Sequence, residues 1–232
     1  MELLSYQQAA IDLSRVEPFL IVEHAPRIGM TVAFADEAVA TASGDSAQSV
    51  VYLAPNADMA AEFILQCGLI AKRKGIYTAP VASRVEDRRL VLVLCFPSGR
   101  ITASAGEGRD LTGVAATVII DQAAWVPGLQ ALIDQALPMI LFGGRVILLS
   151  RRHENPDNLF NLLLKDAIAD MFGGAMRIPI GMAIEAGLFR RICALKGAAW
   201  SREAEEAWEA QLRDLFGKRA SLELDLVDAG HA

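Results

Sequence analysis

The feature that most constrains the fold of this chain is a series of short, fully apolar runs rich in β-branched residues. Each run has the length of a strand, and helical segments lie between many of them. Strands that are apolar on both faces are typical of a parallel sheet covered by helices on both sides. The sequence therefore predicts an α/β fold with a mostly parallel sheet. The predicted strands are 19–23, 49–54, 90–95, 100–103, 117–120 and 145–150, and the predicted helices are 31–41, 57–74, 129–140 and one beginning near residue 158.

The pattern changes after Pro179, where helical segments follow one another. Residues 184–195 and 201–216 are predicted helices, and Ser201 is placed to cap the second one. We expect two parts: an α/β domain over 1–180 and a small helical subdomain over 181–232. The acidic stretch 222–227 is expected to be a linker or a frayed last element.

Composition limits the class of protein and its compartment. The chain has 232 residues, 53% of them hydrophobic, which suffices for a substantial core. No apolar run reaches the roughly 18 residues of a membrane span, and no signal peptide is evident. The three cysteines are far apart and form no zinc spacing with the three histidines. We expect a cytoplasmic protein with reduced thiols, no zinc and no membrane segment.

The net charge of −6 argues against tight binding of nucleic acid by the chain alone, since such proteins are usually basic. Lysines and arginines do cluster locally. They are either solvated helix ends and loops, or a patch that touches a phosphate backbone transiently. The clusters are 72–74, 84–89, 151–152 and 190–191.

The loop from His24 to Thr31 joins the first predicted strand to its helix. A phosphate loop needs small residues, a helix N-terminus, a cation and a hydroxyl for Mg²⁺. Gly29 and Thr31 stand at the right positions, Met30 replaces the usual lysine, and Arg27 is the only nearby cation of fixed charge. The alternative is an ordinary strand–turn–helix connection.

Asp121 and Gln122 follow the apolar run 117–120, and ligands bind at this end of strands in open α/β sheets. Asp121 is placed to hold Mg²⁺ through water. Gln122 can orient an attacking water but cannot take its proton at neutral pH, and loss of a general base typically costs about 10²–10⁴-fold in rate. Some nucleotide hydrolases do position water with a glutamine.

Two further segments carry polar side chains near this edge. Ser150 ends a neighbouring predicted strand, where a polar residue can sense the γ-phosphate. Tyr6 and Gln7 precede the first strand, and the Gln7 amide could pair with an adenine edge. The alternatives are a plain strand end for Ser150 and the start of a surface helix for Gln7.

Taken in order, these segments resemble the ATPase domain of phage terminase large subunits, especially the Mu-like kind. The resemblance covers nearly the whole chain. Tyr6-Gln7 is similar to the adenine-reading motif, His24 to Thr31 to a deviant Walker A loop, and Val118 to Ala124 to a Walker B motif with Asp-Glu-Ala changed to Asp-Gln-Ala. Further similar segments are 96–100 and 108–113 ahead of Walker B, the coupling motif over 149–160, and a Mu-type end through 183–188, Trp208, Gly217 and 223–225.

The resemblance implies a P-loop NTPase fold of the RecA/ASCE type and a motor that packages double-stranded DNA into a phage head. ATP would be bound by Tyr6, Gln7, Ser150 and the loop residues His24, Arg27, Ile28, Gly29, Met30 and Thr31. Thr31 and Asp121 would hold Mg²⁺, and Asp121, Gln122 and Arg27 would serve catalysis. The implied partners are DNA, a portal protein, a small terminase subunit and further copies in a ring, in a bacterial host and encoded by a phage or prophage.

The chain departs from the family pattern at three places. His24 and Pro26 stand where the family has Lys and Arg, and Gln122 stands where it has the catalytic Glu. No nuclease-like carboxylate cluster follows before Ala232, so 181–232 would lead toward an absent nuclease domain. The alternative to an active motor is therefore a pseudo-ATPase that serves as a nucleotide-binding or assembly module. An unrelated RecA-like helicase or a plain α/β binding domain is a third reading.

Arg84, Arg88 and Arg89 are candidates for an arginine acting in the same or a neighbouring subunit's site.

Overall fold

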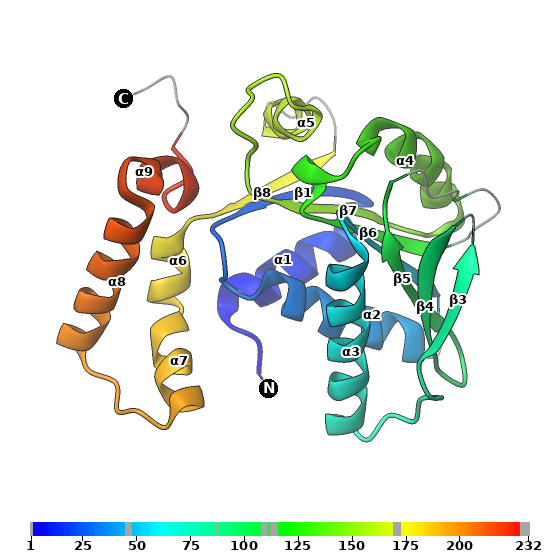
Figure 1. Cartoon of the computed structure of the whole chain (residues 1–232), viewed down its shortest axis with the longest axis horizontal. Coiled ribbons are helices and arrows are strands. Elements are labelled where there is room, and N and C mark those ends of the chain that lie inside the picture. Colours follow the sequence, from blue (N-terminus) through cyan, green and yellow to red (C-terminus); the bar gives the residue numbers. More distant parts are fainter. Residues whose placement is uncertain are drawn as a thin grey trace.

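A single eight-stranded sheet with helices on both faces forms the body of the protein (Figure 1). The computed structural model describes residues 2–44, 48–86, 88–107, 111, 116–168 and 173–227. The strand order is β3-β4-β5-β2-β6-β7-β1-β8. The strands are β1 (Phe19–His24), β2 (Ser49–Ala54), β3 (Ala82–Glu86), β4 (Arg89–Cys95), β5 (Arg100–Ala105), β6 (Ala116–Asp121), β7 (Val146–Ser150) and β8 (Gly174–Ile178).

The predicted α/β fold with a mostly parallel sheet is confirmed. From β5 to β8 all neighbouring strands are parallel, whereas β4 pairs antiparallel with β5 and β3 antiparallel with β4. The sequence missed both edge strands, β3 and β8. Their residues are exposed or only half-buried except Ile178, so neither carries the continuous apolar run that marks a buried strand.

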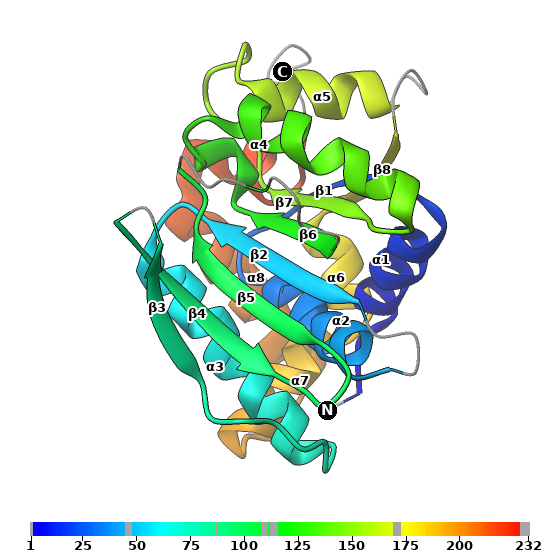
Figure 2. The same cartoon turned by 90° about the vertical axis from the view of Figure 1, so that its right-hand side faces the viewer.

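Side chains alternate between two apolar layers across the sheet. In β1, Leu20 and Val22 belong to one core cluster while Phe19 and Ile21 belong to the other. The first layer is covered by α1 (Ser5–Val16), α2 (Met30–Ser43) and α3 (Ala57–Arg73). The second is covered by α4 (Leu129–Ala136) and α5 (Leu159–Ile168), seen on the opposite side of the sheet in Figure 2.

The predicted helix 129–140 changes its winding before its end. The α-helix stops at Ala136 and continues as a 3₁₀ segment, Leu137–Phe142, with Pro138 in its first turn. Proline has no backbone N–H and therefore breaks the α-helical hydrogen-bond ladder, which explains the change. Among the described residues, no helix has both the length and the apolar character needed to cross a bilayer.

The C-terminal helices form an antiparallel hairpin beside the body (Figure 1). They are α6 (Ile180–Glu185), α7 (Leu188–Lys196), α8 (Arg202–Phe216) and the short α9 (Ala220–Glu223). The predicted helix 184–195 is in fact split at Gly187, whose φ of +91° ends one helix and starts the next. The Ser201 cap is confirmed, because its hydroxyl accepts a hydrogen bond from Ala204 N at 3.1 Å.

The stretch 222–227 is packed against the body, so its prediction as a frayed end is wrong, while its prediction as a linker stays a prediction. Leu224 is 0% exposed, and its carbonyl accepts a hydrogen bond from Ile180 N at 2.8 Å. An apolar side chain every second residue (Leu222, Leu224, Leu226) anchors this acidic segment. The predicted end at residues 228–230 lies outside the described residues.

Candidate active site

The polar residues predicted from the sequence meet at the carboxyl edge of three adjacent strands, β6, β7 and β1. Glu23 pairs with Ser150 across β1 and β7, and Asp121 pairs with Leu149 across β6 and β7. The loop after β1 and the turn after β6 therefore lie on either side of Ser150. This edge is where open α/β sheets bind ligands.

Asp121 is the centre of this arrangement and is fully buried. Its Oδ2 accepts hydrogen bonds from Thr31 Oγ1 at 2.6 Å and from Tyr52 Oη at 2.9 Å, and its Oδ1 accepts one from Gln122 N at 2.8 Å. Thr31 and Asp121, which the sequence assigned to one metal site, are thus in direct contact although they lie 90 residues apart.

Tyr52 is a member of the site that sequence reasoning missed. It stacks on Phe63 with 3.6 Å between ring centroids, which aims its hydroxyl at Asp121. Burial, followed by the charge of Asp121, raises the pKa of Tyr52 well above its usual range, so the phenol stays a neutral donor. The available signal was a hydroxyl inside an otherwise apolar strand next to β6.

The loop before α2 is held in place by hydrogen bonds from side chains of α1. Gln7 Nε2 donates to the carbonyl oxygens of Ile28 at 3.2 Å and Gly29 at 3.1 Å, while Gln7 Oε1 accepts from Leu4 N at 3.0 Å. The hydroxyl of Tyr6 also donates to the carbonyl of Ile28, and burial raises the pKa of Tyr6 to about 12. In this structure Tyr6 and Gln7 fix the loop, and both ends of the Gln7 amide are engaged.

Some loop residues can contact a ligand only through their backbone, and others can do so through their side chains. Gly29, with a φ of +82°, is the N-cap of α2. Ile28 and Met30 point into the core, so only their backbone groups can face a ligand. Arg27 has a φ of +58° and an exposed side chain. The start of a helix supplies N–H groups and a positive dipole end, both suited to phosphate.

The turn after Asp121 is tied directly to β7. Gln122 adopts a left-handed φ of +50° and starts the 3₁₀ turn Ala123–Trp125. Ser150 is fully buried, and its Oγ accepts a hydrogen bond from Ala124 N at 3.2 Å. Ser150 thus connects β7 to the segment that carries Gln122.

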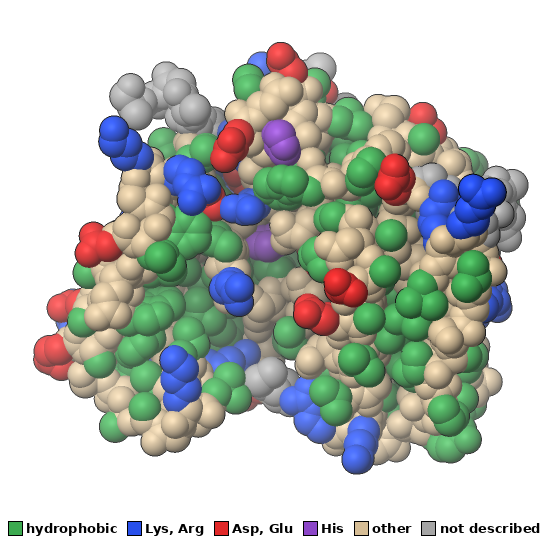
Figure 3. Space-filling model, in the orientation of Figure 1, with side chains coloured by type: hydrophobic (Ala, Val, Ile, Leu, Met, Phe, Trp, Pro, Cys, Tyr) green, Lys and Arg blue, Asp and Glu red, His purple; other side chains and the backbone are tan. Residues whose placement is uncertain are grey.

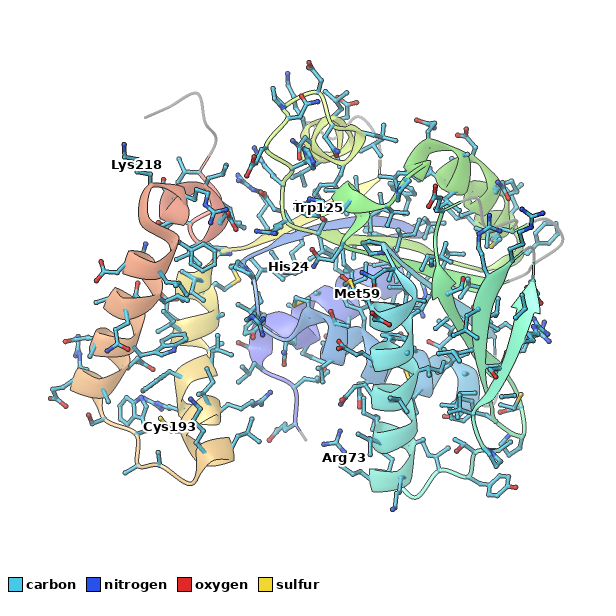
Figure 4. The ribbon with its side chains drawn as sticks, viewed as in Figure 1. His24, Met59, Arg73, Trp125, Cys193 and Lys218 are labelled. Carbon is cyan, nitrogen blue, oxygen red and sulfur yellow. The ribbon has the colours of Figure 1, made fainter. Side chains whose placement is uncertain are left out.

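His24 ends β1 and is 5% exposed. Its Nδ1 lies 2.9 Å from the carbonyl oxygen of Ala25, while its Nε2 is buried without a hydrogen-bond partner among the described residues. Burial lowers the pKa of His24, the charges of Asp121 and Glu23 oppose that effect, and Arg151 adds to it. Figure 4 shows His24 at the end of β1, on the same edge as Trp125.

A buried ion cluster next to His24 was also missed from the sequence. The fully buried Glu23 carboxylate lies 2.7 Å from Arg152 Nε and 2.6 Å from Arg177 Nε. Beside this cluster, Arg151 lies over the Trp125 ring at 4.7 Å and forms an ion pair with Glu223. The only signal in the sequence was a glutamate that ends an apolar strand.

The other predicted residues lie away from this edge. Arg84, Arg88 and Arg89 belong to the β3–β4 hairpin at the far side of the sheet, and Arg84 is paired with Glu86 at 2.6 Å. Of the segment 108–113 only Leu111 is described, and the remaining residues of that prediction lie outside the described part of the chain.

Two curated proteins are similar to the chain over most of its length. The chain is 33% identical over 220 residues to the Mu-like prophage FluMu protein gp28 of Haemophilus influenzae, covering 90% of this chain and 42% of that protein. It is 32% identical over 201 residues to the probable terminase large subunit gp28 of Escherichia phage Mu, covering 81% and 36%. The chain thus spans less than half the length of these relatives. No protein-family model matches it.

Solved structures of phage large terminases share the fold. The ATPase domain of the Thermus phage P74-26 large terminase has a TM-score of 0.59 and 12% identity, covering 96% of this chain and 92% of that one. A large terminase from a thermophilic bacteriophage, solved in complex with ADP, has a TM-score of 0.56 and 12% identity, covering 89% and 50%. The same thermophilic phage terminase is also known in complex with ATP-γ-S.

These findings confirm the resemblance inferred from the order of the motifs. The curated relatives match in sequence over 81–90% of the chain, and the solved structure of a terminase ATPase domain matches in fold over 96% of it. In sequence the chain is therefore similar to Mu-like phage terminase large subunits, and its fold is the P-loop NTPase-like fold of a phage terminase ATPase domain.

Proposed function

We propose that this chain is the ATPase domain of a DNA-packaging motor, in which ATP hydrolysis drives double-stranded DNA into an empty phage head. The observation that carries the proposal is the meeting of Thr31, Asp121 and Ser150 at one edge of the sheet. The similarity to terminase large subunits supports it, as do the ADP and ATP-γ-S complexes of the thermophilic phage terminase.

The donor set at this edge fits magnesium and a nucleotide. The Asp121 carboxylate and the Thr31 hydroxyl are the oxygen ligands that Mg²⁺ prefers, and we assign the metal to them. Bound Mg²⁺ would neutralise phosphate charge. The N–H groups at the start of α2 and the Arg27 side chain would bind phosphates. The nucleotide-binding residues we assign are Tyr6, Gln7, His24, Arg27, Ile28, Gly29, Met30, Thr31 and Ser150, with Tyr6 and Gln7 acting through the loop that they hold.

Gln122 would orient the attacking water by its amide, since it cannot take a proton at neutral pH. Ser150 would transmit a change at the turn after Asp121 to β7, because its hydroxyl is bonded to Ala124 N. An arginine of a neighbouring subunit would complete the site. The exposed β3–β4 hairpin, with Arg84, Arg88 and Arg89, is the part of this chain we assign to that role in the next subunit.

A second candidate function is a pseudo-ATPase that binds nucleotide or supports assembly. Two observations favour it. Gln122 replaces a carboxylate, and Met30 is buried where a phosphate loop usually presents a lysine. Both changes remove charge from the groups that would act on the γ-phosphate.

The experiment that separates the two functions is ATP turnover of the chain and of Gln122→Glu, with and without double-stranded DNA. Gln122→Ala serves as the matched control, because it removes the amide without adding a base. A large rise in turnover for Gln122→Glu supports the motor. Turnover that stays at background in all three proteins, with DNA present, favours the pseudo-ATPase.

The remaining assignments follow from the proposed motor. We assign residues 1–180 to the ATPase domain and 181–232 to a helical subdomain that leads toward a nuclease domain. The partners are DNA, a portal protein, a small terminase subunit and further copies of the chain in a ring. The protein would act in the cytoplasm of a bacterial host, encoded by a phage or prophage.

A further inference from the structure

His24 is the most unusual residue of the loop, because it is buried and only one of its ring nitrogens is bonded. The Ala25 carbonyl oxygen can only accept, so the Nδ1 atom 2.9 Å from it must carry a proton. In the neutral ring, Nε2 then holds a lone pair, and none of the described residues donates to it. A buried acceptor without a donor is rare in folded proteins, and it marks a place where a water or a ligand atom can bind.

The charged groups around the ring come from three strands. On β1 itself, Glu23 attracts a proton to the ring and is also paired with Arg152 and Arg177. At the end of β6, Asp121 attracts a proton as long as no metal is bound to it, and after β7 the guanidinium of Arg151 repels one. Burial has the largest effect and keeps the pKa of His24 below its usual value. Without a ligand, the imidazole is therefore neutral at pH 7.

Binding of a polyphosphate at this edge would change the balance between the neutral and the protonated form of His24. Within the loop 24–31, the only side chains that can carry positive charge are His24 and Arg27, and Arg27 is exposed. Met30 is buried in the core and contributes no charge. Figure 3 shows the face hollowed between the C-terminal helices and the body, with Lys and Arg side chains along the hollow. An incoming anion beside a buried imidazole favours the imidazolium, since opposite charges interact strongly in a low-dielectric setting.

We propose that His24 is a proton-dependent phosphate ligand: binding of a nucleoside polyphosphate is accompanied by uptake of one proton on Nε2, which then donates a hydrogen bond to a phosphate oxygen. The loop thereby gains its buried positive charge only when the ligand is present. This inference rests on the proposed nucleotide-binding function and adds a pH dependence to it.

The sign of the pH dependence follows from the two protonation states. Burial lowers the pKa of His24 in the free protein. In the proposed complex the phosphate raises that pKa, so the complex binds one more proton between the two values. Across that window affinity rises about tenfold for each unit by which the pH falls. At pH values below the pKa of His24 in the free protein, or above its pKa in the complex, His24 does not contribute to the pH dependence of affinity.

The test is isothermal titration of the protein with Mg²⁺ and ATP-γ-S between pH 6 and 9, in buffers of different ionisation enthalpy. The variants are His24→Arg, which stays charged throughout this range, and His24→Gln, which carries no charge. Titration of the nucleotide itself is the same for all three proteins and cancels in the differences. The expected result is close to one additional proton taken up by the unmodified chain relative to His24→Arg. Affinity for His24→Arg should stay nearly constant with pH, and His24→Gln should bind weakly throughout.

Equal proton uptake by the unmodified chain and His24→Arg would overturn the proposal while leaving nucleotide binding intact. Absence of binding by all three proteins at every pH would instead overturn the proposed function, and this inference with it. A second readout is independent of affinity: the imidazole NMR signals of the three histidines, with and without ATP-γ-S. The signal that His24→Gln lacks must shift to the protonated position at pH 7 on binding, and a signal that stays neutral refutes the proposal.

Discussion

Replacing Gly29 with alanine tests how the phosphate loop is held, because two separate features of the structure oppose a side chain there. The φ of +82° lies in the left-handed region, which costs an L-residue about 1–2 kcal/mol. A β-carbon at Gly29 would also lie 2.8 Å from Gln7 Nε2, and no other atom of the described residues, its chain neighbours aside, comes within 4 Å. The Gln7 amide would have to move away.

The cost follows from the bonds that this movement breaks. Gln7 Nε2 donates to the carbonyls of Ile28 and Gly29, and each such bond contributes about 0.5–1.5 kcal/mol. Together with the cost of the left-handed backbone at position 29, the lost hydrogen bonds mean that Gly29→Ala should lower the free energy of unfolding by about 3 kcal/mol. For a chain of this length the melting temperature should fall by roughly 6–12 °C.

Gly75→Ala is the matched control, because Gly75 has a φ of +69° but nothing within 4 Å of an added β-carbon among the described residues. Gly75→Ala should lower the free energy of unfolding only by the cost of a left-handed backbone, about 1–2 kcal/mol. Urea unfolding of both variants, with Gln7→Ala alone and combined with Gly29→Ala, completes a double-mutant cycle. The cycle should show a coupling of at least about 1 kcal/mol, because without the amide there is no clash. Equal losses for the two glycine variants and additive effects with Gln7→Ala would refute this account of the loop.

Three further substitutions test the site. Tyr52→Phe keeps the ring but removes a donor to the Asp121 carboxylate, so urea unfolding should show a loss of about 1.5–3 kcal/mol, and unchanged stability would mean that the bond contributes nothing. Glu23→Gln leaves Arg152 and Arg177 without their shared buried carboxylate and should cost about 3–5 kcal/mol by the same assay; a loss within experimental error contradicts it. Asp121→Asn should abolish the Mg²⁺ dependence of ATP-γ-S binding, and dependence retained in titrations with and without Mg²⁺ would place the metal elsewhere.

The central strands and the location of the site were predictable because their physical cause is local. Runs such as 117–120 and 145–150 are apolar on both faces, which only a doubly covered strand tolerates. Asp121 and Ser150 then had to lie together, since parallel neighbouring strands end at the same edge. The edge strands β3 and β8 were missed because their exposed faces require no apolar pattern.

The contacts within the site were not predictable from the sequence, because their partners are brought together only by the complete fold. Tyr52 meets Asp121 across 69 residues, and Glu23 meets Arg177 across 154. Gln7 was interpreted as a ligand-reading amide because a side-chain amide far along the chain from the loop gives no sign that it is already bonded to that loop. The break at Gly187 was likewise hidden, since glycine occurs within helices as well as between them.

The packing of the last described residues has a consequence for how this part of the molecule opens. Glu223 is paired with Arg151, and the carbonyl of Leu226 accepts a hydrogen bond from Arg177, so the segment 220–227 is fastened to the ends of β7 and β8. Detaching it would leave both guanidinium groups without these partners beside the buried ion cluster. In hydrogen exchange, the amides of 220–227 and of the loop after β7 should therefore become accessible together, as one cooperative unit.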